Sequence, residues 1–245
     1  GFGRPGFEYP ACGNTWPLPA ILNSIMFQQK IFLLLIAFVS FKCSGQDREK
    51  AKKLFVETSP LFIKVEELKS TNKDSAHLLN KKLIQNLEAI FYTDTTFKQI
   101  ADYLGACYAF ENNNEKTIYW YSRQLPEFSH QDFPIACYSC IALAYFKLGE
   151  LDSCKKFILR ANVSFDKNYL GGQRDYLIKL KKMADNIYLN NDTATIHTLK
   201  EKNISPCKYS IETLQFLLPF AEEKKEYFSG NFSKETIADR QKNCR

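Results

Sequence analysis

Cys137 and Cys140 are the residues whose type and spacing come closest to a reactive site. They lie three positions apart, so on a helix they share one face near its start. Because a helix N-terminus lowers the pKa of a thiol, one hypothesis is a thiol-redox or other small enzyme that uses this pair. A second is a metal site completed by a third thiol, although no second CxxC or CxxH pair accompanies them. We favour a third, structural role, because cysteine is a small and readily buried residue.

Other catalytic patterns are missing from the sequence. It contains no GxGxxG, GxxxxGK[ST], HExxH or GxSxG motif. The three histidines are isolated, and the paired carboxylates Glu66-Glu67 and Glu222-Glu223 are adjacent, so on helices they point about 100° apart. We therefore predict no catalytic residue, no cofactor and no metal, and we expect a protein that is not an enzyme.

Two cysteines near the end of the chain are candidates for a disulfide. An exported protein permits such bonds, and a bridge between Cys207 and Cys244 would hold the C-terminal helices together. Closing a loop of that length stabilises a fold by about 3–4 kcal/mol in the loop-entropy description. The pairing is a hypothesis, because sequence alone does not define connectivity.

The charge of the chain argues against nucleic-acid binding. The formal net charge is +6, and the basic residues are interspersed with acidic ones, as in Glu222-Glu223-Lys224-Lys225. Such a mixture is typical of solvated helix faces and lacks the basic stripe that follows a phosphate backbone. We expect an unknown protein or peptide as the partner.

Residues 26–45 have the pattern of a secretion signal. Met26 is a plausible start, Lys30 supplies the positive charge, and the apolar run from Ile31 to Phe41 is too short to span a bilayer. We predict cleavage between Gly45 and Gln46 and a secreted or periplasmic protein. The alternative is a membrane-tethered lipoprotein anchored at Cys43, in which case a membrane is a partner as well.

Residues 1–25 differ from the rest of the chain. They are rich in glycine and proline and show no hydrophobic periodicity. We interpret them as a disordered gene-model extension ahead of the signal. The predicted domain is then residues 46–245.

The predicted domain is helical nearly throughout. From residue 47 onward apolar residues recur every three or four positions, and strand-like alternation is scarce. Helix starts and breaks indicate roughly nine to eleven helices, joined by short loops that favour antiparallel neighbours. We expect starts at Ser59 before Pro60, Asp74, Asp94 or Thr95, Asp132, Asp192, Ser210 and Ser233, and breaks at 112–114, 148–150, 171–172, 205–206 and 229–230. Pro219 should kink or end its helix.

Two stretches within residues 95–166 repeat a pattern of small and bulky residues. The spacing from Tyr108 to Tyr145 is 37 residues, and a small residue precedes each Tyr by three and follows it by nine. The small residues should face each other across a helix hairpin. The repeat-packing residues are Gly105, Tyr108, Thr117 and Tyr121, then Ala142, Tyr145, Cys154 and Ala161.

These positions resemble the tetratricopeptide repeat (TPR). Tyr145 to Asp152 is similar to the end of that family's first helix and the following turn, although Cys154 stands where alanine is usual and the family period is about 34 residues. The resemblance implies an all-α fold in which antiparallel helix hairpins stack as a short TPR-like α-solenoid.

The resemblance also implies a partner-binding groove lined by the first helix of each hairpin. Its candidate residues here are Asp102, Phe110, Leu143, Phe146 and Lys147. The alternative is that the aromatic residues pack against the next helix, since aromatic stripes at helical spacing often form core. The leading functional hypothesis is an exported, non-enzymatic scaffold or adaptor for protein–protein interaction.

Overall fold

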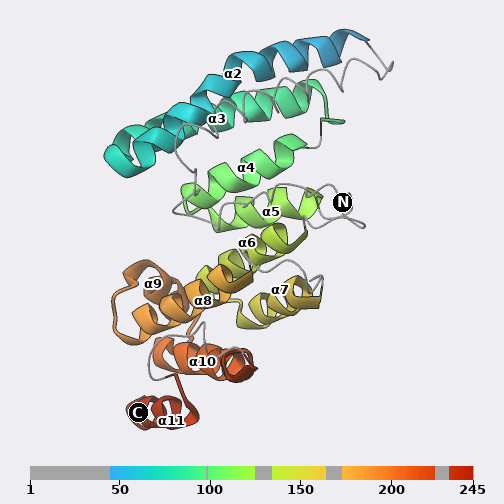
Figure 1. Cartoon of the computed structure of the whole chain (residues 1–245). Helices are drawn as coiled ribbons and strands as arrows, with labels where there is room; N and C mark the ends of the chain where they lie inside the picture. Colours follow the sequence, from blue (N-terminus) through green and yellow to red (C-terminus); the bar gives the residue numbers. More distant parts are fainter. Residues whose placement is uncertain (1–44, 98, 125–133, 164–172, 224–231, 245) are drawn as a thin grey trace, which may run out of the picture.

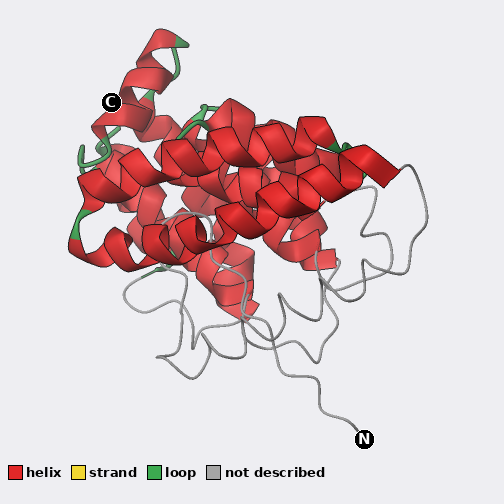
Figure 2. Cartoon of the chain, turned by 90° about the horizontal axis from the view of Figure 1, so that it is seen from above, coloured by secondary structure: helices red, strands yellow, loops and turns green. Residues whose placement is uncertain are grey.

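The computed structural model describes residues 45–97, 99–124, 134–163, 173–223 and 232–244. In that part of the chain the regular secondary structure is all helix, joined by loops and turns (Figures 1 and 2). It contains ten helices and no strand, which confirms the predicted all-α class. The helices are α2 (Gly45–Thr71), α3 (Lys73–Thr93), α4 (Gln99–Phe110), α5 (Asn114–Gln124), α6 (Pro134–Lys147), α7 (Leu151–Val163), α8 (Gln173–Tyr188), α9 (Thr193–Glu201), α10 (Pro206–Glu223) and α11 (Lys234–Lys242). None of these helices is long and apolar enough to cross a membrane.

Consecutive helices from α2 to α7 pack against each other in chain order, and Figure 1 shows them as successive layers. The order changes in the C-terminal part, where α8 packs mainly on α10 and α11 packs on α10. One core cluster is formed by residues of α2 to α5 and a larger one by residues of α6 to α11. Tyr121, Cys137, Cys140 and Ile141 form a small cluster at the junction of α5 and α6.

Several helices begin at the side-chain caps that the sequence predicted. Asp192 accepts a hydrogen bond from the Thr195 amide, and Ser233 forms a capping box with Thr236. The predicted start at Asp74 is two residues too late. The cap of α3 is Asn72, whose side chain accepts a hydrogen bond from the Ser75 amide. The start expected at Ser210 lies four residues after the first residue of α10.

The helix boundary expected at Pro60 is wrong, because α2 continues through this residue. Proline lacks the amide that would bond the Val56 carbonyl. The Ser59 hydroxyl donates to that carbonyl instead, at 2.8 Å. The lost backbone bond is thereby replaced, and the helix continues.

Pro219 likewise lies inside α10 and does not end it. The ring is exposed to solvent, as is Gln215, whose carbonyl loses its partner. Helix α10 nevertheless continues to Glu223. The signal segment, Cys43, and the features predicted at Asp132, 171–172 and 229–230 lie outside the described residues.

The close contact between α4 and α5 occurs at Gly105, but its partner differs from the expected one. A Cβ atom added at Gly105 would lie 2.8 Å from Cδ2 of Tyr121, so the glycine faces the tyrosine ring. The predicted partner, Thr117, is buried and donates its hydroxyl to the Asn113 carbonyl. The small residue therefore accommodates an aromatic ring.

Gly105→Ala should lower the free energy of unfolding by about 1–3 kcal/mol, since overpacking against Tyr121 outweighs the better helix propensity of alanine. Urea unfolding of the single variants and of Gly105→Ala/Tyr121→Leu measures the effect. The double variant should lose less than the sum of the single variants, because the smaller leucine relieves the overlap. Strict additivity would contradict this contact.

Candidate functional site

The three apolar residues predicted to line a binding groove are buried in the core. Phe110, Leu143 and Phe146 are 8%, 3% and 0% exposed. Phe146 packs 5.1 Å from the ring of Tyr209, whose hydroxyl donates to the Phe146 carbonyl at 2.8 Å. Phe110 stacks on the ring of His77 at 4.4 Å. These side chains are satisfied inside the protein, so their assignment as exposed anchors is corrected.

Asp102, another predicted groove residue, lies part-buried on α4 near α5 and α6. Burial raises its pKa to about 6. Its charge adds to burial in raising the pKa values of Tyr121 and Cys137, so all three groups share one poorly solvated environment. A carboxyl with such a pKa changes charge within the range of mild acidity.

Replacing Asp102 by Asn should stabilise the protein at neutral pH. The folded-state pKa lies above the ordinary value of an aspartate, 3.8, so the native state binds more protons, and its stability falls as pH rises from about 4 to 6. Asp102→Asn removes this loss and should raise the free energy of unfolding at pH 7 by about 1–3 kcal/mol, but little at pH 4. Urea unfolding at both pH values tests this, with the fully exposed Asp152→Asn as control. An equal effect of Asp102→Asn at both pH values would contradict it.

Lys147, the remaining groove candidate, is the last residue of α6 and contacts the turn between α4 and α5. Its Nζ donates to Oδ1 of Asn112 at 2.8 Å. Burial lowers its pKa, while the charge of Asp192 acts in the opposite direction. Burial and the charge of Lys147 lower the pKa of Lys179 to about 8. The predicted groove residues thus lie in different environments within the part of the chain that the structure describes.

The free cysteines lie in environments that suppress thiol reactivity. Burial raises the pKa values of Cys107 and Cys154 to about 12 and that of Cys137 well above its usual value. Cys140 is itself disulfide-bonded, whereas Cys137 is free. The two thiols at i and i+3 are therefore not joined to each other as a CxxC redox couple would be in its oxidised form.

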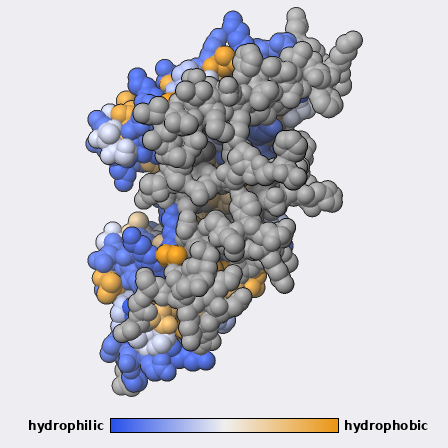
Figure 3. Space-filling view, viewed as in Figure 1, coloured by the Kyte–Doolittle hydropathy of each residue, from blue (hydrophilic) through white to orange (hydrophobic). Residues whose placement is uncertain are grey.

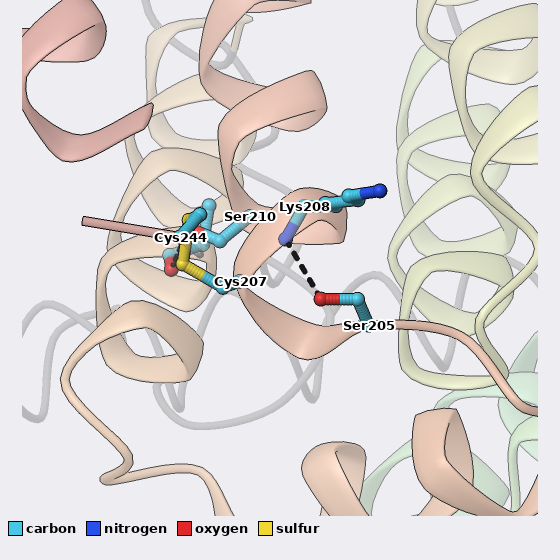
Figure 4. The surroundings of a disulfide bond; sticks show 6 residues. Ser205, Cys207, Lys208, Ser210 and Cys244 are labelled. Atoms are coloured by element: carbon cyan, nitrogen blue, oxygen red, sulfur yellow. Dashed lines mark hydrogen bonds between the residues drawn. A yellow bond between two sulfur atoms is a disulfide. The ribbon is translucent and has the colours of Figure 1, made fainter. Parts of the chain in front are cut away.

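The predicted pair Cys207 and Cys244 is joined by a disulfide with a Cα–Cα distance of 5.6 Å (Figure 4). The bond connects the first turn of α10 to the residues that follow α11. Asp185 of α8 forms an ion pair with Arg240 of α11, and Arg240 lies 4.9 Å from the centroid of the Tyr188 ring. Together these contacts fix the last helix to the bundle.

Sequence reasoning missed a polar cluster between α3 and the C-terminal end of α4. Asn80 is 1% exposed and donates to the Cys107 carbonyl at 3.0 Å and to Glu111 Oε1 at 2.7 Å. Nδ1 of His77 lies 3.1 Å from the same Glu111 oxygen. The available signal was Asn80 itself, a polar residue on the apolar stripe of its helix.

A cavity of about 20 Å³ adjoins this cluster. Glu66, Lys69, Asn80, Tyr103 and Cys107 are among its lining residues. The volume suits a single water molecule and excludes an organic substrate. Of the lining groups, Lys69 pairs with Glu66, and Asn80 bonds the Cys107 carbonyl and Glu111. We interpret the cluster as a satisfied polar contact that orients α3 and α4.

No protein-family model, curated protein or solved structure matches this chain. The geometry alone must therefore support a function. Among the described residues no three His, Cys, Asp or Glu side chains are placed to hold a metal ion. The coloured part of the face seen in Figure 3 is mostly hydrophilic, with separate hydrophobic spots.

Proposed function

We propose that the protein is an exported helical-repeat scaffold that binds another protein or peptide and catalyses no reaction. The observation that carries this proposal is the packing of α2 to α7, in which each helix contacts its neighbour in chain order. Such sequential stacking of helix hairpins is the arrangement expected of a TPR-like α-solenoid. Proteins built this way commonly use their extended surfaces for binding.

The repeat positions support the same proposal. Gly105 and Ala142 are buried in their respective hairpins, and Cys154 and Ala161 are 0% exposed. Tyr145 packs on Phe157 with the two ring centroids 5.6 Å apart. The two hairpins thus bury corresponding residues 37 positions apart, as repeats of one structural unit should.

The scaffold proposal is favoured over the thiol-enzyme alternative by the state of the cysteines. A reactive thiol requires a lowered pKa and access to solvent. Cys107, Cys137 and Cys154 are buried and have raised pKa values. These are properties of cysteines that pack in a core.

Two measurements on protein from its natural source test the proposal. Intact mass should correspond to a chain that begins at Gln46, whereas an acyl addition on Cys43 would identify the tethered alternative and a retained segment 1–45 would contradict export. Chemical cross-linking before lysis, followed by mass spectrometry, should link the protein to one recurrent partner at near-stoichiometric yield. Recovery of the protein only as an unlinked monomer would contradict the scaffold function.

A further inference from the structure

A compact group of aromatic side chains and one arginine lies on α3 and α5, and we call it the aromatic–arginine patch. Tyr92 and Tyr119 are 69% and 49% exposed, whereas Phe91 and Trp120 are buried. The rings of Phe91 and Trp120 pack edge to face with their centroids 5.0 Å apart. The Phe91 centroid lies 5.7 Å from that of Tyr92, and the Trp120 centroid lies 5.1 Å from that of Tyr119. Arg123, also exposed, completes the patch.

Arg123 is held by the rings of the patch. Its guanidinium lies 5.3 Å from the centroid of Phe91 and 5.4 Å from that of Tyr119, and Nη1 donates to the Tyr119 hydroxyl at 2.8 Å. No carboxylate in the described part of the chain pairs with it. One of the five N–H donors is used in this bond, so an oriented cation is presented beside the exposed Tyr119.

Lys116 is the other cation on α5. Lys116 lies 3.7 Å from Glu88 and is neutralised by it. Glu115 lies one helical turn before Tyr119, at the end of the stripe away from Arg123. A negative group is therefore favoured at the Arg123 end only.

We infer that the aromatic–arginine patch is the partner-binding surface, and that it takes a peptide segment with a carboxylate next to an apolar side chain. The inference deepens the proposed scaffold function and rests on it. Tyrosine, tryptophan and arginine are the residues that contribute most to protein–protein binding, and a pre-oriented guanidinium suits bidentate contact with a carboxylate. Tyr92 and Tyr119 would cover the neighbouring apolar side chain.

The second hairpin provides a natural comparison. Arg160 lies 37 residues after Arg123 and also stacks on a ring, 5.2 Å from the centroid of Phe157. The residue that corresponds to Tyr119 is Lys156, so this arginine lacks the exposed tyrosine beside it. Arg160→Gln is therefore a matched control for Arg123→Gln.

Selection of displayed random peptides on the immobilised full chain tests the inference. Enriched peptides should carry Asp or Glu beside an apolar residue, and raised salt should weaken their binding. Arg123→Gln and Tyr119→Ala should each raise the Kd of a selected peptide at least about tenfold, whereas Arg160→Gln should not. All three side chains are at the surface, and unchanged thermal midpoints establish that the variants are folded.

The outcomes separate this inference from the proposed function. Peptides without acidic residues, or peptides whose Kd is unchanged by both patch variants, would overturn the patch but leave a scaffold that binds elsewhere. Failure to enrich any peptide would count against both. Tighter, Arg123-dependent binding of a single-stranded oligonucleotide, used as a competitor, would overturn the assignment to a peptide carboxylate.

Discussion

Phe146→Ala is expected to lower the free energy of unfolding by about 3–5 kcal/mol, because it empties a fully buried site. The side chain is 0% exposed, and the ring of Tyr209 packs against it. Urea unfolding measures this loss directly. The result would show that Phe146 acts through the core and not through a partner.

Two comparison variants make this prediction specific. Leu189→Ala, at a residue that is 58% exposed, should change the stability by less than about 1 kcal/mol. Tyr209→Phe removes only the hydrogen bond from the Tyr209 hydroxyl to the Phe146 carbonyl and should cost about 0.5–1.5 kcal/mol, since that carbonyl still accepts from the Gly149 amide. A Phe146→Ala protein that is as stable as the wild type but no longer binds a partner would restore the groove hypothesis.

Replacing both Cys207 and Cys244 by Ser should lower the free energy of unfolding by about 3–4 kcal/mol. The bond closes a sequence separation of 37 residues, and its removal restores that conformational freedom to the unfolded chain. Removing both cysteines avoids an unpaired thiol. Denaturant unfolding without reductant measures the effect.

Hydrogen exchange shows which helices are destabilised when the Cys207–Cys244 disulfide is removed. Amide exchange should accelerate in α11, which keeps the contact of Ile237 with the core and the Arg240–Asp185 ion pair but loses its covalent link. Exchange in α2 and α3, which lie in a separate core cluster, should not change. Unaltered exchange in α11 would mean that noncovalent contacts suffice to hold it.

Much of the fold was predictable because its signals are local. The apolar spacing of three and four residues predicted helices, and the structure confirms an all-α chain in the residues it describes. Asp192 and Ser233 predicted helix starts because a cap needs only a side-chain oxygen and an amide a few residues later. Export, the partner and the absence of catalysis stay predictions.

Prolines misled the sequence reasoning where a neighbouring group replaced the missing bond. The local rule ends a helix near Pro60, but the Ser59 hydroxyl satisfies the Val56 carbonyl. Pro219 is tolerated on an exposed face. Whether a lost amide matters depends on what else reaches the carbonyl, and composition does not reveal that.

Whether the predicted groove residues are exposed or buried depends on tertiary packing. An apolar stripe such as Phe110, Leu143 and Phe146 has the same spacing whether it faces a groove or another helix. Tyr209 lies 63 residues after Phe146 in sequence, yet it covers that side chain and bonds its carbonyl. Only the folded chain decides between these two environments.

The sequence by itself determined the helical class, several caps and the small residues that allow close helix packing, because these depend on neighbours within a few residues. The tertiary structure decided that Gly105 meets Tyr121, that Asn80 bonds Glu111, and that Arg123 of α5 lies over the ring of Phe91 of α3. Those outcomes depend on how distant helices pack, which side-chain volumes and desolvation set together.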